Sequence, residues 1–474
     1  MANIIITHFS GIFFEGRFQS SCFYDGLVKS LQEHGHSILQ VITSDFLFHP
    51  WNKHNNPISR KIKHQALEEV KKFRPDLIIS FNNSSIEDID LIVECPILLL
   101  DADSCTFFND KDKIRKNLDR YHFGSFSTHG LKDYKNFFSV KDNKMCRIPP
   151  ATSVVAKSSA KTIPISFIGS PFFNNHKVVR ALTDHPYLLN FDVEQFELEK
   201  GAFQELLKEY DVTFAELQFC KAGPKRMKVI NALFDNGIKV FGPQSWKAIA
   251  PFFIDILKAY DPTSIFSLEQ NQNIYNSSTI SLSVSHTQNI TGYPWRVPDI
   301  LASSSVLLTD YSSDLVEDVG NSMRLQIYHS PHEAFLLTQK LLKDEYLLKE
   351  LIHEQNEVVE RKFRWHHRFT IIRELTGVDL SLKSTVPATY KRLQINYSNI
   401  GLILEKVSGS AFCRTKPSGR LHTLVYSLYK NIFKDKKIPL LDNILYHIMR
   451  GKLKANSLLV SNEKSKAIKK NRLH

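Results

Sequence analysis

Short apolar runs alternate along this chain with longer segments in which apolar residues recur at helical spacing. Between the runs, residues 21–34, 62–72 and 130–138 have the periodicity of helices. In the first 150 residues the apolar runs are residues 3–7, 38–43, 77–81, 97–100 and 122–127. Strands that alternate with helices build a parallel sheet that is covered on both faces. The pattern therefore predicts an α/β fold.

The alternation stops at residues 151–162, a small and polar stretch that we interpret as an interdomain linker. It then resumes, with strands expected at residues 164–168, 237–241, 280–284, 306–309 and 324–328. A long helix is expected from about residue 331 to 361. We therefore expect two Rossmann-like domains, residues 1–155 and 156–380, that face a cleft at the carboxyl ends of both sheets.

The net charge of +12 lies entirely in the last part of the chain. Residues 381–474 hold 19 Lys and Arg against 4 Asp and Glu, whereas the first 380 residues hold 42 against 45. We expect this basic extension to be mainly helical, with amphipathic stretches at 421–433 and 440–449 that lie on an anionic membrane or pack on the body. Residues 464–472 are expected to be disordered. A nearly neutral body argues against a protein that binds nucleic acid.

The sequence shows no pattern typical of a disulfide framework, a signal peptide or a membrane span. The six cysteines are far apart and form no CxxC pair, so neither a zinc site nor a disulfide framework is expected. Residues 1–9 lack the features of a signal peptide, and no stretch reaches the 18 apolar residues of a membrane span. We expect a cytoplasmic protein that can rest on the inner face of the membrane.

The common nucleotide-binding motifs are missing. No G-x-G-x-x-G follows a strand, and residues 11–18 carry Arg17 and Phe18 where a P-loop needs Lys and Ser or Thr. Either Gly11 and Gly16 let this loop bend over the cleft, or the loop is an ordinary surface segment. A dinucleotide site and a P-loop ATPase are both unsupported.

Residues 283–314 contain the densest group of polar and charged side chains. The segment is expected to form a strand, a polar loop, a short helix and a second strand. Arg296 and Asp299 are three residues apart and share one face of that helix near its N-terminus, where free amides favour a phosphate. An arginine can bind a diphosphate, and a carboxylate can accept from ribose hydroxyls. The segment therefore predicts a nucleoside diphosphate site without a metal; the alternative is an ordinary ion pair beside a turn.

The order of several segments resembles the C-terminal domain of the CgeB-like glycosyltransferases, a bacterial group with the GT-B fold. Within residues 280–311, Arg296 and Thr309-Asp310-Tyr311 match the family pattern, Asp299 replaces a Glu, and serines at 303–305 stand where glycines are usual. The resemblance covers about residues 164–375. The other segments that carry it are ISFIGS (165–170), IKVFGPQSW (238–246) and EVVERKFRWHHR (357–368).

The resemblance implies a donor site in the second domain and an acceptor site in the first. Gly169 and Ser170 are expected to approach the donor diphosphate, Gly242 to lie near the base, and Asp299 to hold the ribose. Trp246 is expected either to stack on the base or to be a core residue. The remaining residues expected to bind the donor are His286, Tyr293, Arg296, Asp310 and Tyr311. The nucleotide sugar is a substrate, and no cofactor or metal is expected.

Polar residues follow several strands of the first half. Direct displacement at an anomeric carbon needs a base for the acceptor hydroxyl, and His8 and Asp103 stand at the appropriate strand ends. A structural role is the alternative for each. If the enzyme retains configuration, such a base is not needed and the geometry at the donor phosphate dominates. Asp101-Ala102-Asp103 spells a metal-binding Asp-x-Asp motif, which we interpret as coincidence.

These features together predict a glycosyltransferase that moves a sugar from a nucleotide donor to a saccharide or lipid-linked acceptor during synthesis of a bacterial surface glycan. Two alternatives stay open at this point. One is a sugar-nucleotide epimerase, which shares the two-domain fold, and the other is a basic nucleic-acid-binding protein. The sequence leaves the sugar, the nucleotide, the acceptor and the stereochemical course open.

Overall fold

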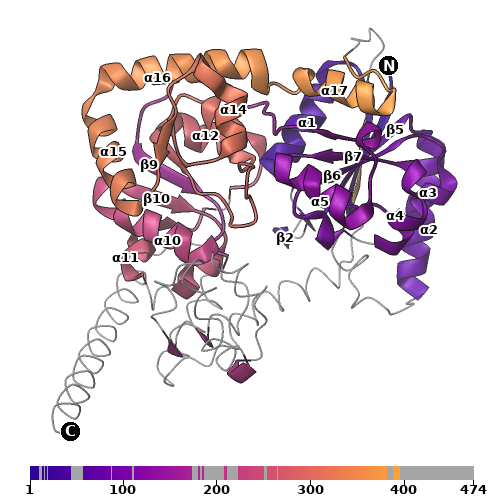
Figure 1. Ribbon diagram of the computed structural model, residues 1–474, viewed down its shortest axis with the longest axis horizontal. Coiled ribbons are helices and arrows are strands. Elements are labelled where there is room, and N and C mark those ends of the chain that lie inside the picture. Colours follow the sequence, from indigo (N-terminus) through magenta and orange to yellow (C-terminus); the bar gives the residue numbers. More distant parts are fainter. Residues whose placement is uncertain are drawn as a thin grey trace. The chain divides into compact units, whose positions relative to one another are not determined.

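The computed structural model describes most of residues 1–394 (Figure 1). The strands form two large parallel sheets with helices around them, so the fold is α/β as predicted. Contacts divide the described residues into two compact units, one with Met1–Thr162, Phe266–His329 and the described residues from Lys340 to Gln394, the other with those in Ile163–Ile265 and Ser330–Gln339. The described residues are 1–9, 13–14, 17–18, 20–43, 57–86, 88–108, 111–172, 180–181, 184–185, 208–210, 222–249, 253–263, 265–381 and 388–394.

The first unit contains a seven-stranded parallel sheet. The strand order is β15 (Tyr390–Gln394), β4 (Ser37–Thr43), β1 (Asn3–Phe9), β5 (Leu77–Phe81), β6 (Ile97–Asp101), β7 (Tyr121–Ser125) and β8 (Met145–Arg147). In β1, Ile5 lies between Leu39 of β4 and Ile78 of β5. Both faces of this sheet are buried, which explains why its strands are continuous apolar runs in the sequence.

Two hydrophobic clusters cover the two faces of this sheet. Successive side chains of a strand point to opposite faces, so Ile5 joins one cluster while Ile4 and Ile6 join the other. The first cluster includes residues of α2 (Pro57–Phe73), α3 (Ile89–Ile92), α4 (Lys111–Lys116) and α5 (Thr128–Phe138). The second is built by α1 (Cys22–Glu33) and α17 (His366–Thr376) (Figure 1).

The edge strand β15 differs from the predicted helical extension. Its five residues pair in parallel with β4, and the hydroxyl of Tyr390 donates to Oε1 of Gln40 at 2.7 Å. Lys391 forms an ion pair with Glu69 of α2. Its sequence, YKRLQ, is mostly polar and lacks the continuous apolar run that marked the other strands, which is why the sequence did not reveal it. The amphipathic stretches 421–433 and 440–449 and the run 464–472 lie outside the described residues.

The second sheet has six parallel strands. Their order is β11 (Tyr260–Asp261), β10 (Ile238–Phe241), β9 (Ile163–Ile168), β12 (Ser278–Ser283), β13 (Val306–Asp310) and β14 (Gln326–Tyr328). In the second unit Ile238 of β10 lies opposite Ile165 of β9, and α10 (Ala222–Ala232) and α11 (Ile254–Ala259) accompany these strands. In the first unit Ile280 of β12 lies opposite Val306 of β13.

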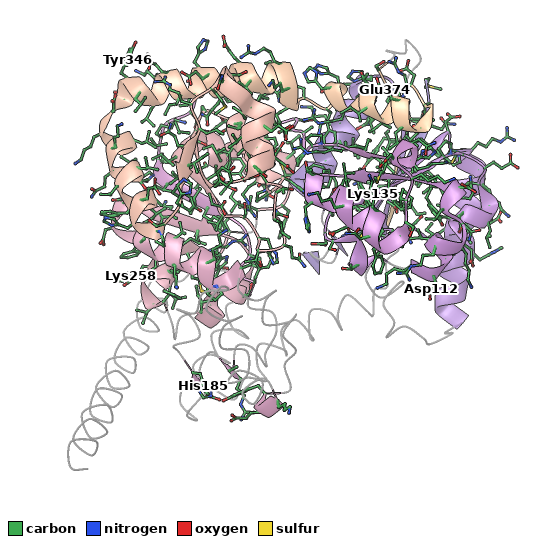
Figure 2. The ribbon with its side chains drawn as sticks, in the orientation of Figure 1. Asp112, Lys135, His185, Lys258, Tyr346 and Glu374 are labelled. Atoms are coloured by element: carbon green, nitrogen blue, oxygen red, sulfur yellow. The ribbon has the colours of Figure 1, made fainter. Side chains whose placement is uncertain are left out.

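In the first unit, α12 (Leu268–Ser277) leads into β12, and α13 (Arg296–Leu301) lies between β12 and β13 in the chain. After β13 come α14 (Ser313–Val319) and, further along the chain, α16 (Glu345–Val358). The single long helix expected at 331–361 is divided into α15 (Pro331–Lys343) and α16, because the carboxylate of Asp344 accepts from the amide of Leu347 and caps a new helix. Figure 2 shows the side chains, with Tyr346 of α16 and Glu374 of α17 on the outside.

The expected linker, residues 151–162, is extended instead of turn-rich and lies along α12. The amide of Val155 donates to the side chain of Gln272 at 3.0 Å, and the amide of Lys157 donates to Oδ1 of Asn276 at 3.1 Å. Lys161 donates to the carbonyls of Asn276 and Ser278 at 2.9 and 3.0 Å. The linker is therefore fixed within the first unit, and the domain boundaries at residues 155 and 380 stay predictions.

Two other expectations concern the loop at residues 11–18 and membrane spans. Of residues 11–18, only the two short strands β2 (Phe13–Phe14) and β3 (Arg17–Phe18) are described, and they pair antiparallel. Gly11 and Gly16 lie outside the described residues. Among the helices that are described, none combines the length and the hydropathy needed to cross a bilayer.

Candidate active site

The segment predicted to bind a donor lies at the carboxyl ends of β12 and β13. These neighbouring parallel strands end at the same edge of the sheet, and α13 begins at Arg296. The carboxylate of Asp310 accepts from the amide of Ser285 at 3.1 Å and from its hydroxyl at 3.0 Å. Asp310 therefore fixes the loop that follows β12. Tyr311 is 57% exposed at this edge, and its ring stacks on that of His329.

Arg296 and Asp299 both lie inside the first unit. Nη1 of Arg296 donates to the carbonyl of Val284 at 3.3 Å, and burial lowers the pKa of this guanidinium. The carboxylate of Asp299 accepts from the hydroxyl of Thr152 at 2.6 Å and from the thiol of Cys22 at 3.4 Å. Burial raises the pKa of Asp299 to about 6, and those two hydrogen bonds oppose the shift.

These contacts restrict what Asp299 can do. The residue is 5% exposed, so a ribose could reach its carboxylate only if neighbouring side chains moved. The expected contact with ribose stays a prediction. Neither Thr152 nor Cys22 was singled out in the sequence, and no local signal marks them, because they lie 147 and 277 residues away from Asp299 along the chain.

Tyr293 and His286 have internal partners in this structure. The hydroxyl of Tyr293 donates to Asp318 at 2.6 Å, and Asp318 also accepts from both terminal nitrogens of Arg147 at 2.8 and 2.6 Å. Nδ1 of the half-buried His286 accepts from the amide of Gln288 at 3.1 Å. A nucleotide contact for either residue stays a prediction, and Arg147 was missed in the sequence.

The second unit contains Gly169, Ser170 and Gly242. A Cβ atom on Gly242 would lie 2.1 Å from the carbonyl oxygen of Gly169, so only glycine fits there. The carbonyl of Ser170 accepts from the buried guanidinium of Arg226, a residue that sequence reasoning missed. The expected roles of these three residues at the donor stay predictions.

The suggestion that Trp246 stacks on a base is wrong. Its side chain is fully buried, and Nε1 donates to the carbonyl of Gly169 at 2.8 Å. The ring packs edge to face against Phe167. A ring that is closed off by protein on all sides has no face left for a nucleobase, and the core interpretation of Trp246 holds.

A second polar cluster lies at the carboxyl ends of β1, β5 and β6. Asn82 adopts a left-handed backbone with φ of 52°, a conformation that is uncommon for residues other than glycine. Its Oδ1 accepts from the amides of Ala102 and Asp103 at 2.7 and 3.0 Å, and its Nδ2 donates to the carboxylate of Asp103 at 2.9 Å. Asn82 thereby holds Asp103 in place.

Asp103 and His8 differ in their access to solvent. Asp103 is exposed, and partial desolvation by the protein around it raises its pKa against the opposing hydrogen bond from Asn82. His8 is fully buried, its ring stacks on that of Tyr24 with 3.9 Å between centroids, and its Nε2 accepts from the amide of Gln40 at 2.9 Å. Burial and the charge of Asp103 raise the pKa of Tyr24. Of the two predicted bases, Asp103 is the one open to a substrate.

Trp295 connects the segment around Arg296 to the polar cluster around His8 and Asp103. This half-buried residue directly precedes Arg296, and its ring lies 4.3 Å from that of Phe23 and 5.4 Å from that of Tyr24, centroid to centroid. Tyr24 in turn stacks on His8. Residues predicted separately from two halves of the sequence therefore belong to one continuous region of the first unit.

The two carboxylates of Asp101-Ala102-Asp103 have different partners. Asp101 accepts from the hydroxyl of Ser125 at 2.6 Å and from the amide of Phe126 at 2.9 Å, and burial raises its pKa to about 8. Asp103 is instead held by Asn82. Within the described part of the chain, no three His, Cys, Asp or Glu side chains are grouped so that they could hold a metal ion.

Comparisons with known proteins find no protein-family model and no curated protein that matches this sequence. Among solved structures, the chain is similar to a glycosyltransferase from Rickettsia africae ESF-5, with 14% identity, 78% of this chain and 98% of that chain covered, and a TM-score of 0.41. HepE (Alr3699) from Anabaena, solved with UDP and glucose, gives 10% identity, 80% and 100% coverage and a TM-score of 0.43. The T4 phage enzyme BGT, solved with UDP and Mn²⁺, gives 12% identity, 78% and 95% coverage and a TM-score of 0.41.

Proposed function

We propose that this protein is a glycosyltransferase of the GT-B class, within the CgeB-like group, that transfers a sugar from a nucleotide sugar to a saccharide or lipid-linked acceptor in bacterial surface glycan synthesis. The observation that carries the proposal is the link through Trp295. It joins the cation Arg296 to the cluster that contains the exposed carboxylate Asp103. Glycosyl transfer needs these two functions near each other, a positive charge for the leaving diphosphate and a base for the acceptor.

Each residue has a defined role in the proposed reaction. The acceptor oxygen forms a bond with the anomeric carbon while the bond from that carbon to the diphosphate oxygen breaks. Asp103 takes the proton of the acceptor hydroxyl, and Arg296 stabilises the negative charge that develops on the diphosphate. His8 holds the ring of Tyr24 and does not take the proton, because its Nε2 already accepts a hydrogen bond. Arg296 supplies the charge that a metal would otherwise supply.

The donor test is a thermal-shift panel of nucleotides and nucleotide sugars. A ligand at 100 times its dissociation constant stabilises a protein by about 2.7 kcal/mol. We expect one nucleotide to raise the melting temperature of the wild type, and Arg296→Gln to lose that shift. Arg324→Gln is the matched control, since Arg324 is an exposed arginine paired with Glu350 and Glu354 on α16. A panel with no shift, or a shift unchanged in Arg296→Gln, contradicts the proposal.

The base test uses Asp103→Asn, which keeps the shape of the side chain. We expect the turnover number to fall by about 10² to 10⁴ while the donor-induced thermal shift is kept, because the amide cannot take the acceptor proton. The wild-type rate is expected to decline as the pH falls through the pKa of Asp103, which lies above the ordinary value. His8→Gln is the comparison, with a smaller loss. Equal rates for wild type and Asp103→Asn would remove Asp103 from the mechanism.

The same assay separates the proposal from a sugar-nucleotide epimerase. A transferase consumes the donor in proportion to a glycosylated acceptor. An epimerase instead interconverts the free sugar nucleotide with no acceptor present, and products of that kind would replace the present proposal. We also propose that the enzyme works in the cytoplasm, on the inner face of the membrane, where its basic extension meets anionic lipid.

A further inference from the structure

A cavity of about 260 Å³ lies in the first unit between the end of β8 and the start of α17. At roughly 30 Å³ for each water, this space has room for several water molecules or a small anion. None of the proposed donor and acceptor residues lines it, and one of them, Tyr293, donates to the lining residue Asp318. The lining residues are Pro149, Asp318, Arg361, Lys362, Phe363, His367 and Arg368.

Arg368 is the most informative of these residues. It is 6% exposed, and its guanidinium donates from Nε to the carbonyl of Pro149 at 2.7 Å and from Nη2 to the carbonyl of Pro150 at 3.2 Å. Both partners are neutral, and the charge of Asp318, which acts on this guanidinium, is shared with Arg147 through two hydrogen bonds. A buried charge that is only partly neutralised is costly, so the site favours an anion beside it.

The rest of the lining adds positive charge. Arg361 is exposed, with its guanidinium at 4.0 Å from the carboxylate of Glu357, which is too long for a strong ion pair. The ammonium of Lys362 donates to the backbone carbonyl of Asp318 at 2.7 Å and thus keeps its full charge. The one carboxylate in the lining, that of Asp318, is already paired with Arg147 through two hydrogen bonds. Three cations therefore line the cavity against one carboxylate, that of Asp318, which is hydrogen-bonded to Arg147.

The backbone here is also unusual. Residues Val359–Phe363 form a π-helical turn between α16 and the start of α17. A π turn contains one residue more than an α turn and recurs at functional sites. Two consecutive residues of this turn, Arg361 and Lys362, line the cavity.

From these observations we propose that the cavity is a binding site for a phosphate group. A phosphate carries up to two negative charges and accepts hydrogen bonds from several directions, which suits two guanidinium groups and one ammonium. The group belongs either to a soluble phosphate compound or to the headgroup of a lipid. The site does not depend on sugar transfer, and it goes beyond the proposed function.

The test is titration calorimetry with inorganic phosphate on the full chain carrying Arg296→Gln, so that the proposed donor site does not contribute. We expect one saturable site, weakened about tenfold or more by the added double change Arg361→Gln and Lys362→Gln, because each change removes a charge-assisted hydrogen bond to the phosphate. The matched control is Lys349→Gln with Arg373→Gln, which removes two cations from exposed faces of α16 and α17. Its affinity is expected to stay within about twofold of the parent, because those side chains are remote from the lining.

The variant Arg368→Lys is a second test, because lysine keeps the positive charge but lacks the planar guanidinium group. We expect it to bind phosphate more weakly than the parent protein. Its melting temperature without ligand shows whether it folds. No saturable heat with the parent protein, or equal affinity in the Arg361 and Lys362 double variant, would overturn the proposal. Sedimentation with phosphatidic acid vesicles, against phosphatidylcholine vesicles, then identifies the source. Loss of vesicle binding in the double variant supports a lipid headgroup, and unchanged vesicle binding supports a soluble phosphate compound.

Discussion

Asp101 and Asp103 are two residues apart in the sequence, yet their surroundings give them different chemistry. Asp101 is buried between the ends of β6 and β7 and accepts from Ser125 and Phe126. Asp103 is exposed beside Asn82. The pKa of Asp101 is raised to about 8, mainly by burial. At the residue scale, therefore, the buried carboxyl of Asp101 has a structural role, whereas the exposed carboxyl of Asp103 is available to a substrate.

The raised pKa of Asp101 predicts a pH-dependent stability. An unfolded aspartate has a pKa of about 3.9, so between pH 4 and 8 the folded protein binds more protons at this site and stability falls as the pH rises. Asp101→Asn keeps the acceptor for Phe126 and removes the titration. We expect the variant to gain about 1 to 3 kcal/mol relative to wild type between pH 5 and 8.5. Urea unfolding at both pH values measures this, and a stability difference that is the same at both would show that Asp101 does not titrate in this range.

At the scale of elements, the five inner strands of the first sheet were predicted, whereas its two edge strands, β15 and β8, were not. Strands such as β5 and β6 are buried on both faces, so their sequences are apolar throughout and stand out locally. The strand β15 is recognisable only through its partner β4, about 350 residues earlier in the chain. The break between α15 and α16 was missed for a different reason, since the capping residue Asp344 is a local signal that could have been used.

The edge strand gives a prediction about truncation. A chain that ends at residue 394 keeps β15, whereas a chain that ends at residue 381 loses it and exposes the edge of β4. We expect the shorter chain to be less stable by about 2 to 4 kcal/mol, because several ladder hydrogen bonds are worth about 1 kcal/mol each. Each chain is the control for the other, as both lack the basic residues beyond 394. Equal midpoints in urea would mean that β15 adds nothing to the sheet.

At the scale of the whole molecule, the proposed activity depends on one aromatic contact. Trp295 packs on Phe23 and Tyr24, and it is the covalent neighbour of Arg296. The charge distribution agrees with a body that does not bind polyanions over its whole surface, because residues 1–380 carry 42 Lys and Arg against 45 Asp and Glu. Local groups of cations, such as those around the proposed phosphate site, then act against a nearly neutral background.

This contact predicts how Trp295 variants behave. In Trp295→Ala the helix start at Arg296 is no longer fixed to the ring of Tyr24, and a misplacement of about 1 Å can cost about 10² in rate. We expect the turnover number to fall by about 10 to 100 times while the Michaelis constant for the donor changes less than about threefold. Trp295→Phe keeps a ring at this position and is expected to retain most of the activity. A turnover number in Trp295→Ala equal to that of the wild type would show that activity does not depend on the contact of Trp295 with Tyr24.

The sequence by itself determined the α/β class, most strands of both sheets, and the presence of Arg296 and Asp299 on one helical turn. These properties follow from apolar periodicity and from spacing within a few residues, which are local quantities. The tertiary structure alone decided that Asp103 is open while His8 is buried, that Trp246 is a core residue, and that Thr152 and Cys22 surround Asp299. Burial and hydrogen-bond partners depend on residues far apart in the chain, so no short segment of the sequence encodes them.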